Sequence, residues 1–360
     1  MRLERRPQPS AIALVLAPIA AVAFTLGISA LLVLWAGAPV GRTYEAILQG
    51  GFGSLFAWSE TLTRAVPLIL TGLAATVAFK SHFYNIGAEG QLYGGALAAV
   101  AVGSAFGPEN LINDPTLAFV LMLAAAMAAG ALLLLGPAWM KARLGVDEVV
   151  TTLLLNFIVL LGVGALLDGP MKDPTAMGWP QSVALPGELE LSRPLQGLRL
   201  HTGLAVAVAL AAALWVLLKF TVLGFDIRAT GANARAAAFA GVPALRTALL
   251  VAVLSGALAG LAGAVEVAGR TGYVTLDMSP GYGYSGIVIA MLAGLHPLAV
   301  VAAAVFVAGM LVGADSMSRV VGVPTYIADV VVATSLSAVR VAALAAQYRL
   351  RRKTPAAASA

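Results

Sequence analysis

Long apolar runs recur along this 360-residue chain and decide what it can fold into. Each run has about 20 residues, the length that a helix needs to cross a bilayer. Hydrophobic residues make up 60% of the chain and charged residues 11%, whereas a soluble domain carries about 25% charged residues. Because so few polar groups cannot cover a surface in water, the sequence predicts an all-α polytopic membrane protein, with one transmembrane domain over residues 11–345.

We expect about ten transmembrane helices, some of them short or broken. The apolar runs place them near residues 11–36, 61–80, 85–106, 116–140, 147–167, 201–221, 245–267, 283–294, 297–314 and 324–345. The first run is longer than the apolar core of a signal peptide, so we expect it to remain as a helix.

The basic residues predict the orientation of these helices. With the N-terminus inside, 15 of the 22 Lys and Arg residues fall in inner segments and 7 in outer ones, and basic residues are enriched in cytoplasmic loops. We therefore expect both termini in the cytoplasm, with residues 1–10 before the first span and a basic tail at residues 346–360.

The longest polar insert, residues 168–200, is rich in Pro and Gly and holds Trp179. Span parity places it outside. A connecting loop and a docking surface for an extracellular partner are both open interpretations, because long loops are often functional.

The chain also suggests an internal repeat. Residues 60–106 and 246–294 each contain an apolar span, a basic residue, aromatic and Gly residues, and a second apolar span. The two copies enter the membrane from opposite sides. This order predicts an inverted-topology repeat, with a site at the repeat interface near the bilayer midplane.

An Ala-rich basic stretch, ATGANARAAAFAGV at residues 229–242, lies between two apolar spans and is too polar to be one. Gly231 and Gly241 bracket it, Pro243 ends it, and Ala is the strongest helix former. Parity places the segment 226–243 in the cytoplasm as one short helix. The residues alone leave two interpretations open: a linker helix, or a helix that docks into a groove of another protein.

Polar side chains also occur inside or beside the spans. A carboxylate such as Glu89 costs roughly 2.5–3.5 kcal/mol to insert into lipid, so it normally faces a cavity or a partner. Asn156 either bonds another helix or lines a path. Glu266 can pair with Arg270 at i+4 or act as a gate. Three aromatic residues are expected to be interface anchors rather than stacking groups: Tyr273, Tyr282 and Tyr284.

Four ordered motifs carry a resemblance to a known family. GANARAAAFAGV resembles the Gly-x-Asn-x-x-Ala-Ala-x-x-Ala-Gly-Ile coupling-helix signature of ABC-importer permeases. Three others resemble motifs of the nucleoside and simple-sugar permeases: FYNIGAEGQLYGGALAA (83–99), LGVDEVVTTLLLNFI (144–158) and GYGYSGIVIAMLAGLHPLA (281–299). Asp147, Leu155 and Val242 depart from the usual Asn, Met and Ile. The sequence is identified as a member of the branched-chain amino acid/simple sugar/nucleoside permease family, nucleoside-type branch.

The resemblance implies two sets of functional residues. One seats in the cleft of a cytoplasmic ATPase and consists of Gly231, Asn233, Ala236, Ala237, Ala240 and Gly241. The other lines a substrate path, with polar groups for ribose hydroxyls and apolar faces for a base: Phe83, Tyr84, Asn85, Glu89, Gln91, Asn156 and Phe157.

The expected function is the permease subunit of an ATP-binding cassette importer for nucleosides. Alternatives are a permease for a simple sugar such as ribose or for branched-chain amino acids, and a proton-coupled secondary transporter that uses Glu89 or Glu266. The chain has no Gly-x-x-x-x-Gly-Lys-Ser/Thr pattern, no cysteine and three scattered histidines. We therefore expect no enzyme activity, no metal site and no cofactor in this chain, with ATP and Mg bound by a partner ATPase.

The expected partners follow from the same resemblance. They are cytoplasmic ABC ATPase subunits, a second permease chain in a homo- or heterodimer, an extracellular or periplasmic solute-binding protein, and membrane lipid, without nucleic acid. The expected location is a bacterial or archaeal-type plasma (inner) membrane, which the chain crosses several times.

Overall fold

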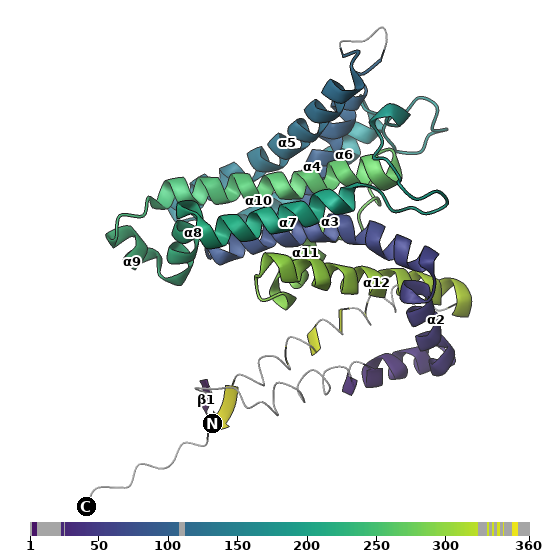
Figure 1. Cartoon of the computed structure of the whole chain (residues 1–360), viewed down its shortest axis with the longest axis horizontal. Coiled ribbons are helices and arrows are strands. Elements are labelled where there is room, and N and C mark those ends of the chain that lie inside the picture. The colour runs from purple at the N-terminus through teal and green to yellow at the C-terminus, as the bar shows by residue number, and fades with distance from the viewer. Residues whose placement is uncertain are drawn as a thin grey trace, which may run out of the picture. The chain divides into compact units, whose positions relative to one another are not determined.

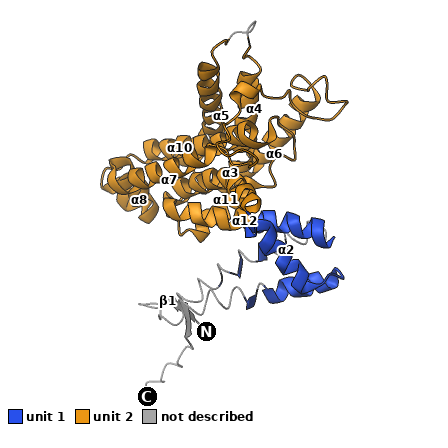
Figure 2. Cartoon of the chain, turned by 45° about the vertical axis from the view of Figure 1, so that its right-hand side comes forward, with its two compact units in different colours: residues 1–54, 310–360 blue, residues 55–309 orange. Residues whose placement is uncertain are grey.

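The computed structural model describes residues 2–5, 23–24, 26–107, 112–322, 330, 333–334, 337–338, 341 and 348–351. Most of the predicted spans 11–36 and 324–345, and the terminal segments around them, lie outside these residues. The chain divides into two compact units, Met1–Ser54 with Met310–Ala360 and Leu55–Gly309 (Figure 2). Each unit is described by itself.

The long elements of the unit Leu55–Gly309 are all helices (Figure 1). They are α3 (Leu55–Lys80), α4 (Ala88–Gly103), α5 (Pro115–Leu144), α6 (Glu148–Asp168), the 3₁₀ turn η1 (Gly187–Leu189), α7 (Gly203–Phe220), α8 (Val222–Ala232), α9 (Ala234–Phe239), α10 (Ala244–Glu266), the π-helical turn η2 (Val267–Thr271), α11 (Tyr282–Leu292) and the first half of α12 (Pro297–Val321). Helix α3 runs beside both α7 and α10 (Figure 1).

Local sequence signals set the corner between α5 and α6. Gly145 ends α5 in the left-handed conformation at φ 69°, which Gly adopts without steric cost. Asp147 then caps α6, because its side chain accepts a hydrogen bond from the Val149 amide at 2.8 Å. Asn and Asp are equally good at this position, so the replacement of Asn by Asp147 keeps the cap.

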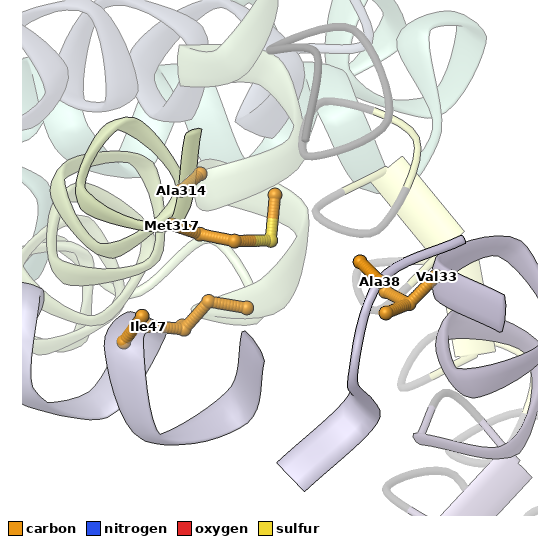
Figure 3. Close-up of a cluster of buried hydrophobic side chains, with 6 residues drawn as sticks. Val33, Ala38, Ile47, Ala314 and Met317 are labelled. Atoms are coloured by element: carbon orange, nitrogen blue, oxygen red, sulfur yellow. The ribbon is translucent and has the colours of Figure 1, made fainter. Parts of the chain in front are cut away.

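The other unit contains α2 (Val40–Phe52), helical residues 26–35 and the second half of α12. A small apolar cluster holds it together, with Val33 and Ala38 on one side and Ile47, Ala314 and Met317 on the other (Figure 3). The strands β1 (Arg2–Arg5) and β2 (Tyr348–Arg351) pair antiparallel, with Arg2 opposite Arg351. The sequence analysis predicted neither strand.

Among the described residues, six helices are long and apolar enough to cross a bilayer, or seven if the bent pair 26–35 and α2 counts as one span. The six are α3, α5, α6, α7, α10 with η2, and α12. They match six of the predicted runs, and they make the chain a polytopic helical membrane protein.

The structure differs from the sequence analysis at three places. The predicted span 283–294 is α11, whose 11 residues rise only about 16 Å, half the thickness of a hydrocarbon core. Helix α2 was not predicted, and it lies at 116° to the helix before it. Helix α12 continues past the predicted end at residue 314 to Val321, with Arg319 in its last turn.

Glycines let the backbone of α10 touch its neighbours. A Cβ on Gly256 would lie 2.3 Å from the Gly130 carbonyl oxygen of α5, and one on Gly95 of α4 would lie 2.2 Å from the Gly260 carbonyl oxygen. No side chain fits at these distances. Small residues permit this close approach between membrane helices, so α4, α10 and α5 pack backbone to backbone.

Candidate functional site

Two short helices meet end to end inside the larger unit. Non-helical residues 81–87 separate α3 from α4, and residues 272–281 separate η2 from α11. Each predicted repeat copy is therefore a long helix, a break and a shorter helix. The N-termini of α4 and α11 lie in contact, because a Cβ on Gly283 would be 2.2 Å from the Glu89 amide nitrogen.

Glu89 connects these two N-termini. Its Oε2 accepts a hydrogen bond from the Gly283 amide at 2.6 Å. The amides of a first helical turn have no partner within their own helix, and the dipole there favours a negative charge. A carboxylate from α4 thus caps α11, which explains how this buried acid is accommodated.

A stripe on α6 holds the first break in place. Glu148, Thr152 and Asn156 are spaced at i, i+4 and i+8, so they share one helical face. Their oxygens accept hydrogen bonds from the amides of Tyr84 (3.0 Å), Ile86 (3.1 Å) and Gly90 (2.7 Å), in that order. The stripe thereby supplies partners for backbone donors that the break leaves without a helix.

Glu148 and Thr152 were missed by the sequence analysis as members of this site. Glu148 also forms an ion pair with Lys141 at 2.5 Å, and Lys141 donates to the His82 carbonyl at 2.8 Å. The signal was present in the sequence, because three polar residues four apart in an apolar span predict a polar face.

An amide pair ties the break to two more helices. Asn85 and Gln91 bond reciprocally at 2.9 and 3.0 Å. Asn85 Nδ2 also donates to Ser255 Oγ of α10 at 3.0 Å, and that hydroxyl donates to the Ala74 carbonyl of α3 at 2.8 Å. Since every one of these groups is buried, the network fixes the break against α3, α4 and α10.

The predicted path residues fall into two classes. Five are buried, at 1–3% exposure: Phe83, Asn85, Glu89, Gln91 and Asn156. Tyr84 and Phe157 are 40% and 55% exposed. Asn156 donates to the Ile86 carbonyl at 2.8 Å and to the Tyr284 hydroxyl at 3.2 Å, so it bonds between helices. A path-lining role for these residues stays a prediction.

The expected pair at the end of α10 is present. Arg270 Nη1 donates to Glu266 Oε1 and, at 3.0 Å, to the Tyr282 hydroxyl. Tyr282 is fully buried, so its interpretation as an interface anchor was wrong. Tyr273 and Tyr284 are each 37% exposed.

The segment 226–243 is two helices rather than the single helix that was predicted. Asn233 ends α8 and caps α9, where its side chain accepts from the Ala236 amide at 3.0 Å. Its extended backbone, with φ −161°, breaks the helix. Asn competes with helical hydrogen bonds in this way.

The six predicted coupling residues do not share one face. Gly231 is buried, and a Cβ there would lie 1.9 Å from the Lys80 carbonyl oxygen. Ala237 is also buried, whereas the other four are exposed: Asn233, Ala236, Ala240 and Gly241. Phe239, which the sequence analysis did not select, is 97% exposed at the end of α9. The exposed surface of this segment therefore includes an aromatic side chain, at the end of α9.

The insert 168–200 pairs with η2 and with the residues that follow it. Its amides at Ser182, Leu185 and Leu191 donate to the carbonyls of Val274, Gly272 and Ala268 at 2.7–3.0 Å. Met177 and Trp179 of the insert are exposed. No group of three metal-ligating side chains occurs in the described part of the chain.

Comparison with known proteins finds a matching family and several relatives of this chain. Residues 57–343 match a family described as the permease component of a branched-chain amino acid transport system. The chain is 35% identical to a guanosine ABC transporter permease of Bacillus subtilis, covering 88% of this chain and 90% of that one. It is 30% identical to a nucleoside ABC transporter permease of Lactococcus lactis, covering 89% and 88%, and 39% identical to a glucose ABC transporter permease of Haloferax volcanii, covering 77% and 74%.

Proposed function

The chain belongs to the family of branched-chain amino acid transport system permease components, and from that premise we propose that it is the membrane subunit of an ATP-driven importer for nucleosides. Two relatives that cover almost the whole chain are named for guanosine or nucleosides. A sugar is the second candidate solute, because the relative named for glucose is 39% identical over a shorter stretch.

The observation that carries an ATP-driven mechanism is the exposed tip of α9. A Phe side chain that is 97% exposed costs solvation free energy unless another surface covers it. Residues 240–243 join this tip directly to α10. We propose that Phe239, with Asn233, Ala236, Ala240 and Gly241, docks into a cytoplasmic ATPase subunit, while Gly231 and Ala237 anchor the segment to its own chain.

Substitution of Phe239 tests the docking. In the assembled complex, Phe239→Ser should abolish solute-stimulated ATP hydrolysis and leave the amount of membrane-inserted chain unchanged. Phe220→Ser is the matched control, because Phe220 is 65% exposed at the end of α7 and lies outside the segment. If the Phe239→Ser complex shows solute-stimulated ATP hydrolysis at the wild-type level, this docking surface is excluded.

The rest of the assembly follows the proposed topology. Ten spans with both termini in the cytoplasm place the insert 168–200 outside, where Met177 and Trp179 contact a solute-binding protein. The complex contains two ATPases, which bind ATP and Mg, and a second permease chain. The chain itself is not an enzyme, holds no cofactor, and resides in a plasma (inner) membrane of bacterial or archaeal type.

The proposed path runs where the breaks of the two repeat copies meet, near the bilayer midplane. Tyr84 and Phe157 offer exposed aromatic faces there. The buried groups Phe83, Asn85, Glu89, Gln91 and Asn156 form its wall and reach the solute when the helices separate.

Competition for uptake separates the two candidate solutes. In vesicles with the complete complex, unlabelled guanosine should displace a labelled nucleoside at lower concentrations than ribose, glucose or leucine do. If glucose or leucine competes and guanosine does not, the solute assignment is wrong, although the family assignment stands.

A further inference from the structure

A cavity of about 300 Å³ lies between α3, the end of α10 and the insert 168–200. Its polar lining consists of Glu60, Thr63, Arg64, Arg193, Arg199 and Arg270. None of the predicted path residues contributes to it. On the proposed topology, the cavity opens at the outer face.

Positive charge is in excess around this cavity. Glu60 pairs with Arg199, with Arg199 Nε 3.1 Å from its Oε1, and the buried Glu266 pairs with Arg270. The lining itself thus holds four guanidinium groups and one carboxylate, that of Glu60. Glu190 lies 3.7 Å from Arg193, but both side chains are nearly half exposed, and such surface pairs contribute little.

Thr63 adds a second and independent observation. Its side chain is 2% exposed, and its hydroxyl has no hydrogen-bond partner. Buried hydroxyl groups in proteins almost always have one. A donor at the wall of a cationic cavity therefore lacks an acceptor that an anion would supply.

We propose that this cavity binds a phosphate group. Planar guanidinium forks match the oxygens of phosphate, and the volume lies at the lower end of the range for ligand pockets. Four guanidinium groups and a hydroxyl offer more donors than the two oxygens of a carboxylate can accept. The site does not depend on which solute the permease carries.

Thermal unfolding of the purified full-length chain in uncharged detergent tests the proposal. Sodium phosphate should raise the apparent Tm above that in sodium chloride of equal ionic strength, by about 2 °C at a tenfold excess over Kd. The double variant Arg193→Gln, Arg199→Gln should raise the Kd for phosphate by about tenfold or more. Arg143→Gln is the control, because Arg143 is exposed on α5 and does not line the cavity.

Thr63→Val separates ligand binding from folding. Val has nearly the same shape and removes a hydroxyl that has no protein partner, so the Tm without phosphate should stay at the wild-type value or rise. The Kd for phosphate should increase about fivefold. An unchanged phosphate response in both Thr63→Val and the double arginine variant would overturn the proposal, and an equal shift with sodium acetate would overturn the preference for phosphate.

The phosphate can be free in solution or part of a lipid headgroup, and two measurements distinguish these sources. A soluble phosphate raises the Tm equally in detergent and in lipid nanodiscs. A lipid phosphate appears in native mass spectrometry as one phospholipid retained by the wild type and lost from the double variant. Either result supports the site, whereas the absence of both contradicts it.

Discussion

Asn156 provides for α4 what a soluble helix obtains from its own N-cap residue. The N-cap of α4 is Gly87, which has no side chain to accept a hydrogen bond. Asn156 Oδ1 reaches across from α6 to the Gly90 amide at 2.7 Å. From the sequence, an Asn within an apolar span is equally compatible with a helix contact and a path. The choice depends on which backbone donors lie opposite, and only the folded structure supplies that information.

Asn156→Leu should therefore destabilise the protein. The substitution keeps the volume but removes the partner of the buried Gly90 amide and of the part-buried Ile86 carbonyl. At about 1–3 kcal/mol for each such group, we expect a lower Tm of the purified chain in detergent. Leu154→Ala is the control, because Leu154 is 55% exposed on the same helix. Equal Tm values for Asn156→Leu and the wild type would contradict the capping role.

His201 is expected to make stability depend on pH. Burial and the charge of Arg193 lower the pKa of His201 to about 4, whereas an unfolded His titrates near 6.5. The Nδ1 atom accepts from the Gly203 amide at 3.2 Å, which a protonated ring cannot do. As the pH falls, the unfolded state takes up the proton first. The contribution of neutral His201 to the free energy of unfolding is therefore complete above about pH 6.5 and is lost as the pH falls towards 4. The loss amounts to at most about 3 kcal/mol.

Unfolding of the wild type and of His201→Gln between pH 7.5 and pH 4.5 checks this expectation. The Tm difference between the two proteins should shrink or reverse as the pH falls. Parallel Tm profiles across the range would show that the ring does not titrate as proposed.

At the scale of the elements, the long apolar helices were predictable because lipid requires about 20 apolar residues in a row. The two short helices, α4 and α11, were also located, by the runs 85–106 and 283–294, but the contacts that stabilise them were not predicted. Helices α4 and α11 are stabilised by caps from distant elements, such as Glu89 on the Gly283 amide, and hydropathy carries no information about such contacts. A helical segment at 226–243 was predicted from its residues, and its coupling role stays a prediction. Its exposed face could not be predicted, because the break at Asn233 rotates α9 relative to α8.

The glycines of α5 provide a prediction with an internal control. A Cβ on Gly130 would lie only 2.1 Å from the Gly256 carbonyl oxygen, whereas a Cβ on Gly136 would have no atom within 4 Å. Gly130→Ala should lower the Tm, because overpacking costs about 1–3 kcal/mol. Gly136→Ala should leave it equal or raise it, since Ala favours a helix by about 1 kcal/mol over Gly. Similar effects of the two substitutions would mean that α5 and α10 are not in backbone contact.

For the whole molecule, the energy source distinguishes the proposed importer from a proton-coupled carrier. The carboxylate of Glu89 caps a helix and that of Glu266 forms an ion pair, so each has a structural role, and we expect uptake to be independent of a proton gradient. Vesicles that contain ATP and an uncoupler should continue to accumulate solute. If uptake collapses on addition of the uncoupler while ATP is unchanged, the proton-coupled alternative is correct.

The backbone contacts among α4, α10 and α5 also limit how the transporter can move. Where a carbonyl oxygen sits against a Cα atom, neither sliding nor rotation of one helix past the other is possible without first separating them. We therefore expect the three helices to move together as one body. A displacement applied at α9 enters α10 through four residues and must shift all three helices together. We therefore expect the gap that admits a solute to open at a helix interface other than those among α4, α10 and α5.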